Sequence, residues 1–297
     1  MQLDQLKAFS AVVKKGGFER AMESIHLSQP AISIRVKELE KHLGTELFKR
    51  LGRRIELTDA GRIVAEYTDR VMIVLDEMTL AIDELKGFKR GQLRCGATTT
   101  IAVHLLPKVL VQFKKTFPNV EIKIVVEKTA EIEKQILANE LDLGMVSGTT
   151  TNPSAFKVVH YLTDEFVLIT PPDHPLAGRP KVTLRQIAKF PLILRDKGSL
   201  PRSIIDESFR AAGLSYNCMM VIETSEALKK AVAEGLGCSI TPHCSIQLEK
   251  QTNTLAYARI AGSPMKREFR AITHKDRKLL GPAKPFLDLL CGELTAF

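Results

Sequence analysis

The sequence lacks several features that would assign it to a class at once. No run of about 18 apolar residues occurs, so we expect no membrane-spanning helix. Charged side chains interrupt the first twenty residues, and this excludes a secretory signal. These charged residues are Asp4, Lys7, Lys14, Lys15, Glu19 and Arg20. We therefore expect a soluble, cytoplasmic protein that does not associate with a membrane.

Cysteines are few and widely spread. The five cysteines are Cys95, Cys218, Cys238, Cys244 and Cys291, and none forms a Cys-x-x-Cys pair. An odd number of scattered thiols argues against a disulfide framework and against a zinc site. We expect buried thiols and no bound metal.

Signatures of catalysis are also missing. The sequence has no His-Glu-x-x-His, no Gly-x-Ser-x-Gly and no phosphate loop of the Walker type. Seven histidines fall in other motifs, at His26, His42, His104, His160, His174, His243 and His274. We therefore predict no catalytic residues, no cofactor and no enzymatic activity.

The chain has the length and composition of a globular protein with two or three domains. Its 297 residues are 44% hydrophobic and 26% charged, which is enough apolar material for sizeable cores. The net charge of +9 is unevenly distributed, with +4 in residues 1–58, −4 in residues 59–88 and +9 in residues 89–297. This balance indicates an anionic partner, but the acidic middle segment is not expected to contact phosphates.

Residues 17–43 have the pattern of two short helices joined by a tight corner. Gly17 can cap the first helix, and Ser28 can cap the second with Pro30 in its first turn, where a missing amide hydrogen costs nothing. The first helix has its apolar stripe at Phe18, Ala21 and Ile25. The second has Ile32, Val36, Leu39 and Leu43 on its inward face and Gln29, Ser33, Arg35 and Lys37 on or near its outward faces.

Such a pair is typical of a helix-turn-helix. In that motif, the N-terminal residues of the second helix contact base edges in the major groove of DNA. The alternative is an ordinary helical hairpin with a solvated polar face.

A basic hairpin is expected directly after this pair. Gly44 ends the second helix, and residues 47–50 lead through Gly52 to residues 55–57, as in a two-stranded wing. The tip presents Arg50, Arg53 and Arg54, which suit phosphates or a minor groove. A solvated loop is the alternative.

Residues 59–86 predict one long helix, with Thr58 as its cap and Gly87 as its stop. At 1.5 Å per residue it would be about 42 Å long. A heptad seam runs along it at Val64, Tyr67, Val71, Val74, Met78, Ala81 and Leu85. Two such helices would form a two-fold dimer that matches a palindromic DNA site. The alternative is a single helix packed on its own core.

From Gly91 onward, strands and helices alternate. We expect strands at residues 92–96, 120–126, 141–146, 166–170, 191–194, 219–222 and 238–241, and helices at 101–117, 129–139, 201–212 and 225–234. Residues 98–100 and 171–175 are expected loops. This α/β pattern predicts parallel sheets covered by helices in two lobes, with a ligand in the gap near the carboxyl ends of the strands.

Hydroxyl and guanidinium groups are expected to gather at these strand ends. The candidates are Thr98, Thr99, Thr100, Thr129 and Ser147 in the first lobe, and Arg195, Ser199, Arg202 and Thr224 in the second. Such donors, converging with free helix amides, favour a small carboxylate, phosphate or sulfate ligand. For each threonine or serine taken alone, a plain helix cap is the alternative.

With these residues in order, the chain resembles a LysR-type transcriptional regulator over nearly its whole length. The resemblance is carried by Ser28-Gln29-Pro30-Ala31-Ile32-Ser33, Leu39-Glu40, Leu43-Gly44, Leu47-Phe48, Arg50, Arg53 and Leu57-Thr58-x-Ala60-Gly61. It implies an α/β protein with an N-terminal winged helix-turn-helix domain of all-α type at residues 1–58. A dimerising linker helix at 59–88 and a two-lobed effector domain at 89–297, similar to periplasmic solute-binding proteins, would follow.

Within the effector domain, we place lobe I at about residues 89–162 and 267–297 and lobe II at about residues 163–266. The resemblance also implies a homodimer through the linker helix that assembles into a homotetramer. Expected partners are double-stranded promoter DNA and a small anionic metabolite as effector, with RNA polymerase as a further candidate.

The family positions imply distinct roles in DNA binding. Residues that would contact base edges are Gln29, Pro30 and Ser33, whereas Ser28, Arg35, Arg50, Arg53 and Arg54 would lie nearer phosphates or the minor groove. The side chains of Gln29 and Ser33 can both donate and accept hydrogen bonds, so they suit base discrimination.

The second lobe resembles a subgroup of regulators of carbon or sulfur assimilation. That subgroup has Arg-Glu-x-Gly-Ser-Gly-Thr-Arg and Ser-Thr-Glu-Ala-Ile-Lys, where this chain has residues 195–202 and 224–229. Leu200-Pro201 replaces Gly-Thr, which removes a donor and stiffens the loop. The ligand of the subgroup is therefore not carried over.

The sequence thus predicts a sequence-specific DNA-binding regulator switched by a small anion bound between two lobes. The alternative is a redox-sensing regulator of the same fold that acts through Cys238 and Cys244, although nothing near them in sequence marks a depressed thiol pKa. A solute-binding protein without a regulatory role would not need residues 1–88.

Overall fold

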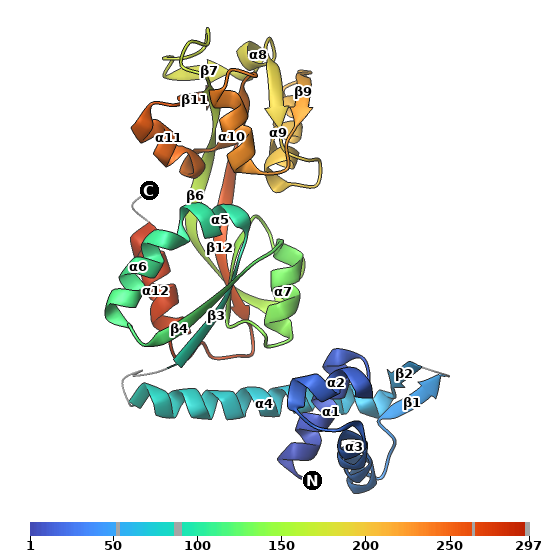
Figure 1. Cartoon of the computed structure of the whole chain (residues 1–297). Coiled ribbons are helices and arrows are strands. Elements are labelled where there is room, and N and C mark those ends of the chain that lie inside the picture. Colours follow the sequence, from blue (N-terminus) through green and yellow to red (C-terminus); the bar gives the residue numbers. More distant parts are fainter. Residues whose placement is uncertain (52–53, 86–90, 263–264, 295–297) are drawn as a thin grey trace. The chain divides into compact units, whose positions relative to one another are not determined.

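The computed structural model describes residues 1–51, 54–85, 91–262 and 265–294 (Figure 1). The chain divides into two compact units, Met1–Gly87 and Phe88–Phe297. Within the described ranges, no helix combines the length and the apolar character that crossing a membrane requires.

The first unit is a group of helices with a small hairpin. Its elements are α1 (Leu3–Lys15), α2 (Phe18–Ile25), α3 (Gln29–Leu43), β1 (Phe48–Leu51), β2 (Arg54–Leu57) and α4 (Asp59–Leu85). One apolar core joins them around the buried side chains of Phe9, Ile32 and Leu47. The sequence prediction does not include α1, although Leu6, Phe9 and Val12 recur at a spacing of three and are buried.

The predicted helix pair is confirmed. Gly17 is the N-cap of α2, and Oγ of Ser28 accepts a hydrogen bond from the Ala31 amide at the start of α3. The inward residues Ile32, Val36 and Leu39 are buried. The same prediction is wrong for Leu43, which is 39% exposed, because this last residue of α3 lies beyond the small core.

The predicted long helix is confirmed as α4, which has 27 residues. The predicted cap is also present, since Oγ1 of Thr58 accepts a hydrogen bond of 2.9 Å from the Gly61 amide. An exposed apolar stripe follows spacings of three and four along α4. Its members, 40–62% exposed, are Ile63, Tyr67, Val71, Val74, Met78 and Ile82.

This stripe differs from the predicted seam at one end. Val64 packs against the core of the first unit, so the seam is wrong there, and the neighbouring Ile63 is exposed instead. The side chains of Ala81 and Leu85 lie outside the described residues.

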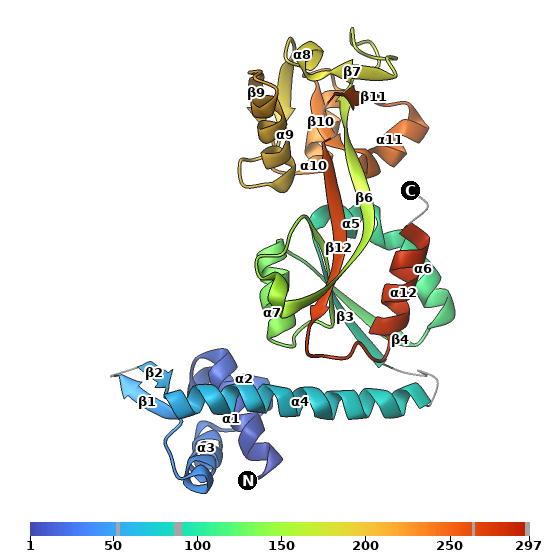
Figure 2. The same cartoon turned by 180° about the vertical axis from the view of Figure 1, so that it is seen from behind.

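The second unit consists of two lobes joined by two long strands (Figures 1 and 2). The strands β6 (Phe156–Thr170) and β12 (Lys266–His274) are antiparallel and run from one lobe into the other. Lobe I contains β3 (Gly91–Ala97), β4 (Val120–Val126), β5 (Leu143–Ser147), α5 (Thr99–His104), α6 (Leu106–Thr116), α7 (Thr129–Leu137), the 3-10 turn η1 (Pro153–Ala155) and α12 (Ala283–Leu294).

Lobe II is built from shorter strands and four helices. Its elements are β7 (Lys181–Thr183), α8 (Leu184–Ile187), β8 (Pro191–Leu194), α9 (Leu200–Ala211), β9 (Asn217–Val221), α10 (Ser225–Ala233), β10 (Ser239–Pro242), the 3-10 turn η2 (His243–Ile246), α11 (Gln247–Thr252) and β11 (Ala256–Ala261). Each lobe has an apolar core of its own, around Phe113 and Phe286 in lobe I and around Leu192 and Phe209 in lobe II.

The sheet passes through both lobes. Its strand order is β4-β3-β5-β12-β6-β11-β7, with β10 also paired to β6, whereas β8 and β9 form a separate pair. The parallel pairing that strand–helix repeats predict is present among β3, β4 and β5. The complete sheet is mixed, because β12 is antiparallel to both β5 and β6.

Two predicted elements have the wrong bounds. The strand expected at residues 166–170 is only the end of β6, which has 15 residues. Its earlier part was missed because polar side chains such as His160 and Asp164 interrupt the apolar pattern. The helix expected at 101–117 is divided into α5 and α6, since Pro107 has no amide hydrogen to continue the first helix.

This division changes the surroundings of the threonine cluster. Thr99 and Thr100, which we expected in a loop, are the first two residues of α5, and Thr98 is its N-cap. All three follow the carboxyl end of β3.

Candidate functional sites

The start of α3 carries the predicted DNA-contacting side chains. Ser28, Gln29 and Pro30 are exposed, and Ser33 one turn later is half-buried. The guanidinium of Arg35 lies 3.8 Å from the carboxylate of Asp4 in α1. The polar leading edge is therefore available to a partner at its first residues, whereas Arg35 has an intramolecular partner.

The predicted wing is present as β1 and β2. Arg50 pairs in register with Ile55, and Arg54 pairs with Leu51. Across the hairpin, Lys49 forms an ion pair of 3.3 Å with Glu56. The side chains of Arg50 and Arg54, and Arg53 as a whole, lie outside the described residues.

In lobe I, two of the predicted effector residues contact each other. The hydroxyls of Thr98 and Ser147 share a hydrogen bond of 3.1 Å between the ends of β3 and β5. In the described structure Thr98 makes no side-chain cap to its own helix. Parallel strands thus bring these hydroxyls together at one edge of the sheet, as the sequence predicts.

Thr100 has a partner that sequence reasoning missed. Nη1 of Arg267, on β12, donates a hydrogen bond of 3.4 Å to its hydroxyl. The side chain of Arg267 is only 2% exposed; it pairs with Asp164 at 3.2 Å and stacks on the rings of Phe166 and Phe269. No local signal marks Arg267, because it reaches Thr100 only through the pairing of β12 with β6.

Thr129 is held apart from this group. It is the half-buried first residue of α7, whose N-cap is Lys128. Within the described ranges, no hydrogen bond joins Thr129 to the other predicted residues. The same helix supplies Glu133, which is buried and accepts hydrogen bonds from the amide and hydroxyl of Thr151, so it fixes the loop that follows Ser147.

In lobe II, the predicted hydroxyls cap their own helices. Oγ of Ser199 accepts a hydrogen bond of 3.4 Å from the Arg202 amide at the start of α9. Oγ1 of Thr224 accepts one of 3.3 Å from the Ala227 amide at the start of α10. These two residues therefore have the structural role that is the alternative for every such hydroxyl.

The two predicted arginines of lobe II differ. Arg202 is buried, donates to Asp206 at 2.7 Å and to the carbonyl of Arg195 at 3.1 Å, and so ties α9 to the preceding loop. Arg195 is half-buried and donates to Oγ of Ser225 at 2.9 Å, in the first turn of α10. Arg195 therefore lies beside the helix start, whereas Arg202 is enclosed within the lobe.

Side chains of the two lobes meet beside these residues. A methyl group added at Gly148, directly after Ser147, would lie 3.2 Å from Cδ2 of Leu200 in α9. Nε2 of His104, in α5, lies 3.4 Å from Oε1 of Glu226 in α10. The predicted effector residues of lobe I are thus flanked by direct contacts with lobe II, and sequence reasoning missed these contacts.

The two cysteines of the redox alternative are buried in different clusters. Cys238 belongs to the core of lobe II, and Cys244 packs against the core of lobe I. Burial raises the pKa of Cys238 to about 11 and also raises that of Cys244. Because the thiolate is the reactive form, these surroundings disfavour a redox role.

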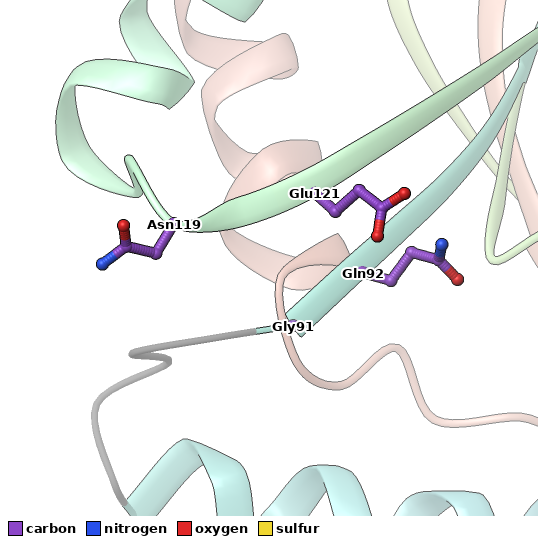
Figure 3. Close-up of a pocket in the computed structure, with 4 residues that line it drawn as sticks. All are labelled: Gly91, Gln92, Asn119 and Glu121. Atoms are coloured by element: carbon purple, nitrogen blue, oxygen red, sulfur yellow. The ribbon is translucent and has the colours of Figure 1, made fainter.

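The hollow shown in Figure 3 lies elsewhere. Its lining residues are Gly91, Gln92, Asn119 and Glu121, at the beginning of β3 and around the beginning of β4. It is therefore at the opposite end of the strands from Thr98. The described lining includes one carboxylate and no cation, so it does not suit an anion.

Comparison with known proteins identifies the family. Residues 3–62 match the family described as bacterial regulatory helix-turn-helix protein, lysR family, and residues 86–294 match the LysR substrate binding domain. The HTH-type transcriptional activator CmpR of Synechocystis sp. is 33% identical over 97% of this chain and 94% of its own length. The RuBisCO operon transcriptional regulator of Allochromatium vinosum is 31% identical over 99% and 96%.

A solved structure extends the comparison to a ligand complex. The regulatory domain of CcmR from Synechocystis PCC6803, in complex with 2-PG, superposes with a TM-score of 0.62 and is 26% identical. The match covers 69% of this chain and 98% of that domain.

Proposed function

The chain belongs to the LysR family of bacterial transcriptional regulators, and from this premise we propose how its residues divide the work of an effector-switched regulator. It is a DNA-binding regulator that responds to a small metabolite, and it is not an enzyme. In our proposal, residues 1–58 bind DNA, residues 59–88 dimerise and residues 89–297 bind the effector. A regulator of promoter DNA acts in the cytoplasm.

The observation that carries the effector proposal is the hydroxyl edge of lobe I. We give this name to Thr98, Thr100 and Ser147, which lie at neighbouring strand ends and contact one another or Arg267. Hydroxyls beside a buried guanidinium suit a small anion. Since CcmR is found in complex with 2-PG, we propose an effector of the same ionic character.

The remaining predicted residues act around this edge. Thr99 precedes Thr100 in α5, and Thr129 starts the neighbouring helix α7, so both are placed to complete the anion site. Arg195 approaches from lobe II. The caps Ser199 and Thr224, together with Arg202, hold the lobe II loops in position.

The exposed stripe of α4 supports a dimer. Six apolar side chains repeat at helical spacing and remain 40–62% exposed, which is the pattern of a helix that pairs with another helix. We propose that a second copy of the chain covers it, that two dimers form a tetramer, and that each dimer presents two α3 helices to a palindromic DNA site.

The experiment that tests this function measures promoter binding with and without 2-PG. The full chain is titrated onto a labelled DNA fragment from upstream of its own gene, and fluorescence anisotropy is followed. An anion that prefers one closure of the lobes must change the affinity or the complex size, because equal binding to both closures would switch nothing. If 2-PG binds the protein but changes neither, the proposed switch is wrong.

The DNA-reading role of α3 has its own test. Replacing Gln29 with alanine should weaken binding to the specific fragment by about 1–3 kcal/mol, roughly five- to a hundredfold, because a base-edge contact is lost. Binding to random DNA, which depends on phosphate contacts, should change less. Equal losses on both fragments would remove Gln29 from the base-reading residues, and Gln112→Ala, at an exposed position of α6, is the control.

A further inference from the structure

His104 occupies a contact between the lobes. It is the last residue of α5, which lies on the side of lobe I that faces α10 (Figures 1 and 2). Its Nε2 reaches Oε1 of Glu226 in the first turn of α10 at 3.4 Å, and its side chain is only 15% exposed. The structure therefore places an ionisable group where the two lobes touch.

The charged groups around this imidazole do not balance. Lys229 is 4% exposed and is shared between Glu226 at 2.9 Å and Glu249 at 2.7 Å. The other cation that faces His104 is Arg267, and Asp164 pairs with it at 3.2 Å. With three carboxylates and two permanent cations, this cluster has one excess negative charge while His104 is neutral.

His104 also belongs to the proposed effector site. It follows Thr100 by four residues, so both side chains lie on one face of α5. Arg267 donates to Thr100 on that face. An anion bound at Thr100 therefore adds a second negative charge next to Glu226, and a proton on His104 would offset it.

We propose that His104 takes up one proton from solvent when the effector anion binds, so that its imidazolium lies between the anion and Glu226 and holds the lobes together. This inference rests on the proposed function, since it needs an anion at the hydroxyl edge. The proton balance is simple: the free imidazole gains one proton, Glu226 stays ionised, and the anion keeps its charge.

The free protein is prepared for this uptake. Burial lowers the pKa of His104 below its usual value; Lys229 and Arg267 lower it further, while Glu226 and Glu249 oppose them. His104 is therefore neutral above pH 7 before the anion arrives. Because protonation accompanies binding, affinity should rise roughly tenfold for each pH unit by which the solution is made more acidic, until the pKa of free His104 is reached.

The test is calorimetric titration of the full chain with 2-PG at pH 8 in two buffers of different ionisation enthalpy. For the wild type, we expect an uptake of close to one proton per bound anion. His104→Gln keeps a polar side chain opposite Glu226 but cannot accept the proton, so its uptake should fall close to zero. The ratio of wild-type to variant affinity should also grow as the pH is lowered, and the ionisation of 2-PG itself cancels in this ratio.

Two further variants make the result specific. Glu226→Gln removes the excess charge, so it should reduce the uptake and flatten the pH dependence while the anion still binds at pH 8. His160→Gln alters an exposed histidine of β6 that contacts Thr163, and should behave as the wild type. Binding of 2-PG without proton uptake, or equal uptake in His104→Gln, overturns this inference alone, whereas no binding at any pH overturns the proposed anion site with it.

Discussion

The two lobes treat their helix starts differently. In lobe II, the caps of α8, α9 and α10 are Thr183, Ser199 and Thr224, and each hydroxyl accepts a hydrogen bond from its own helix. In the described part of lobe I, neither Thr98 at α5 nor Lys128 at α7 caps its helix with a side chain. The difference shows that a hydroxyl between a strand and a helix does not by itself mark a binding site.

What separates the lobes is where each hydroxyl finds its partner. Thr98 and Thr100 bond to Ser147 and Arg267, which come from other strands, so their positions depend on the tertiary fold. The lobe II caps are satisfied within a single turn. We therefore assign recognition of the anion mainly to lobe I and the shape of its enclosure mainly to lobe II.

The largest expected effect in this comparison comes from Thr100→Val. The substitution keeps the side-chain volume but removes the hydroxyl that Arg267 contacts and that the proposed anion would share. A hydrogen bond to a charged group is worth about 1.5–3 kcal/mol, so affinity for 2-PG should fall roughly ten- to a hundredfold. Calorimetric titration of the full chain measures this loss.

A matched control separates this effect from a general loss of stability. Thr116 is an exposed threonine at the end of α6, and Thr116→Val should bind 2-PG as the wild type does. An affinity of Thr100→Val within twofold of the wild type would show that the hydroxyl edge does not recognise the anion.

The same contrast explains which features the sequence could predict. Ser28 and Pro30 specify the start of α3 through contacts within one helical turn, and the strand ends follow from local apolar runs, so both could be predicted. Thr98 and Ser147 could be paired because neighbouring parallel strands end at one edge. These predictions needed only short-range patterns or the general geometry of α/β sheets.

The missed residues depend on contacts that are distant in sequence. Arg267 reaches Thr100 only after β12 has paired with β6, and His104 reaches Glu226 only where α5 meets α10. Neither side chain carries a motif. Ser199 and Arg202 show the converse, since their residue types suit an anion but their geometry ties them to the Arg202 amide and to Asp206.

An intermediate effect is expected from Ser199→Ala. Loss of an N-cap hydroxyl should lower the free energy of unfolding by about 1 kcal/mol. Affinity for 2-PG should stay within twofold, because this hydroxyl is used by α9. Chemical denaturation and titration of the same preparation measure the two quantities. A tenfold loss of affinity at unchanged stability would contradict the division between the lobes and make Ser199 part of the anion site.

The smallest effect is expected from Cys238→Ser. This thiol is buried in the core of lobe II, where its Sγ lies 3.6 Å from the carbonyl oxygen of Pro191, and burial raises its pKa to about 11. A serine hydroxyl can donate to the same carbonyl, so the fold should tolerate the change. Mild peroxide should leave promoter binding of the wild type and of Cys238→Ser within twofold of their untreated values, because too little thiolate forms to react. If peroxide altered promoter binding by the wild type and not by the variant, lobe II would contain a sensor rather than a purely structural core, and the anion switch would have to be replaced by a redox one.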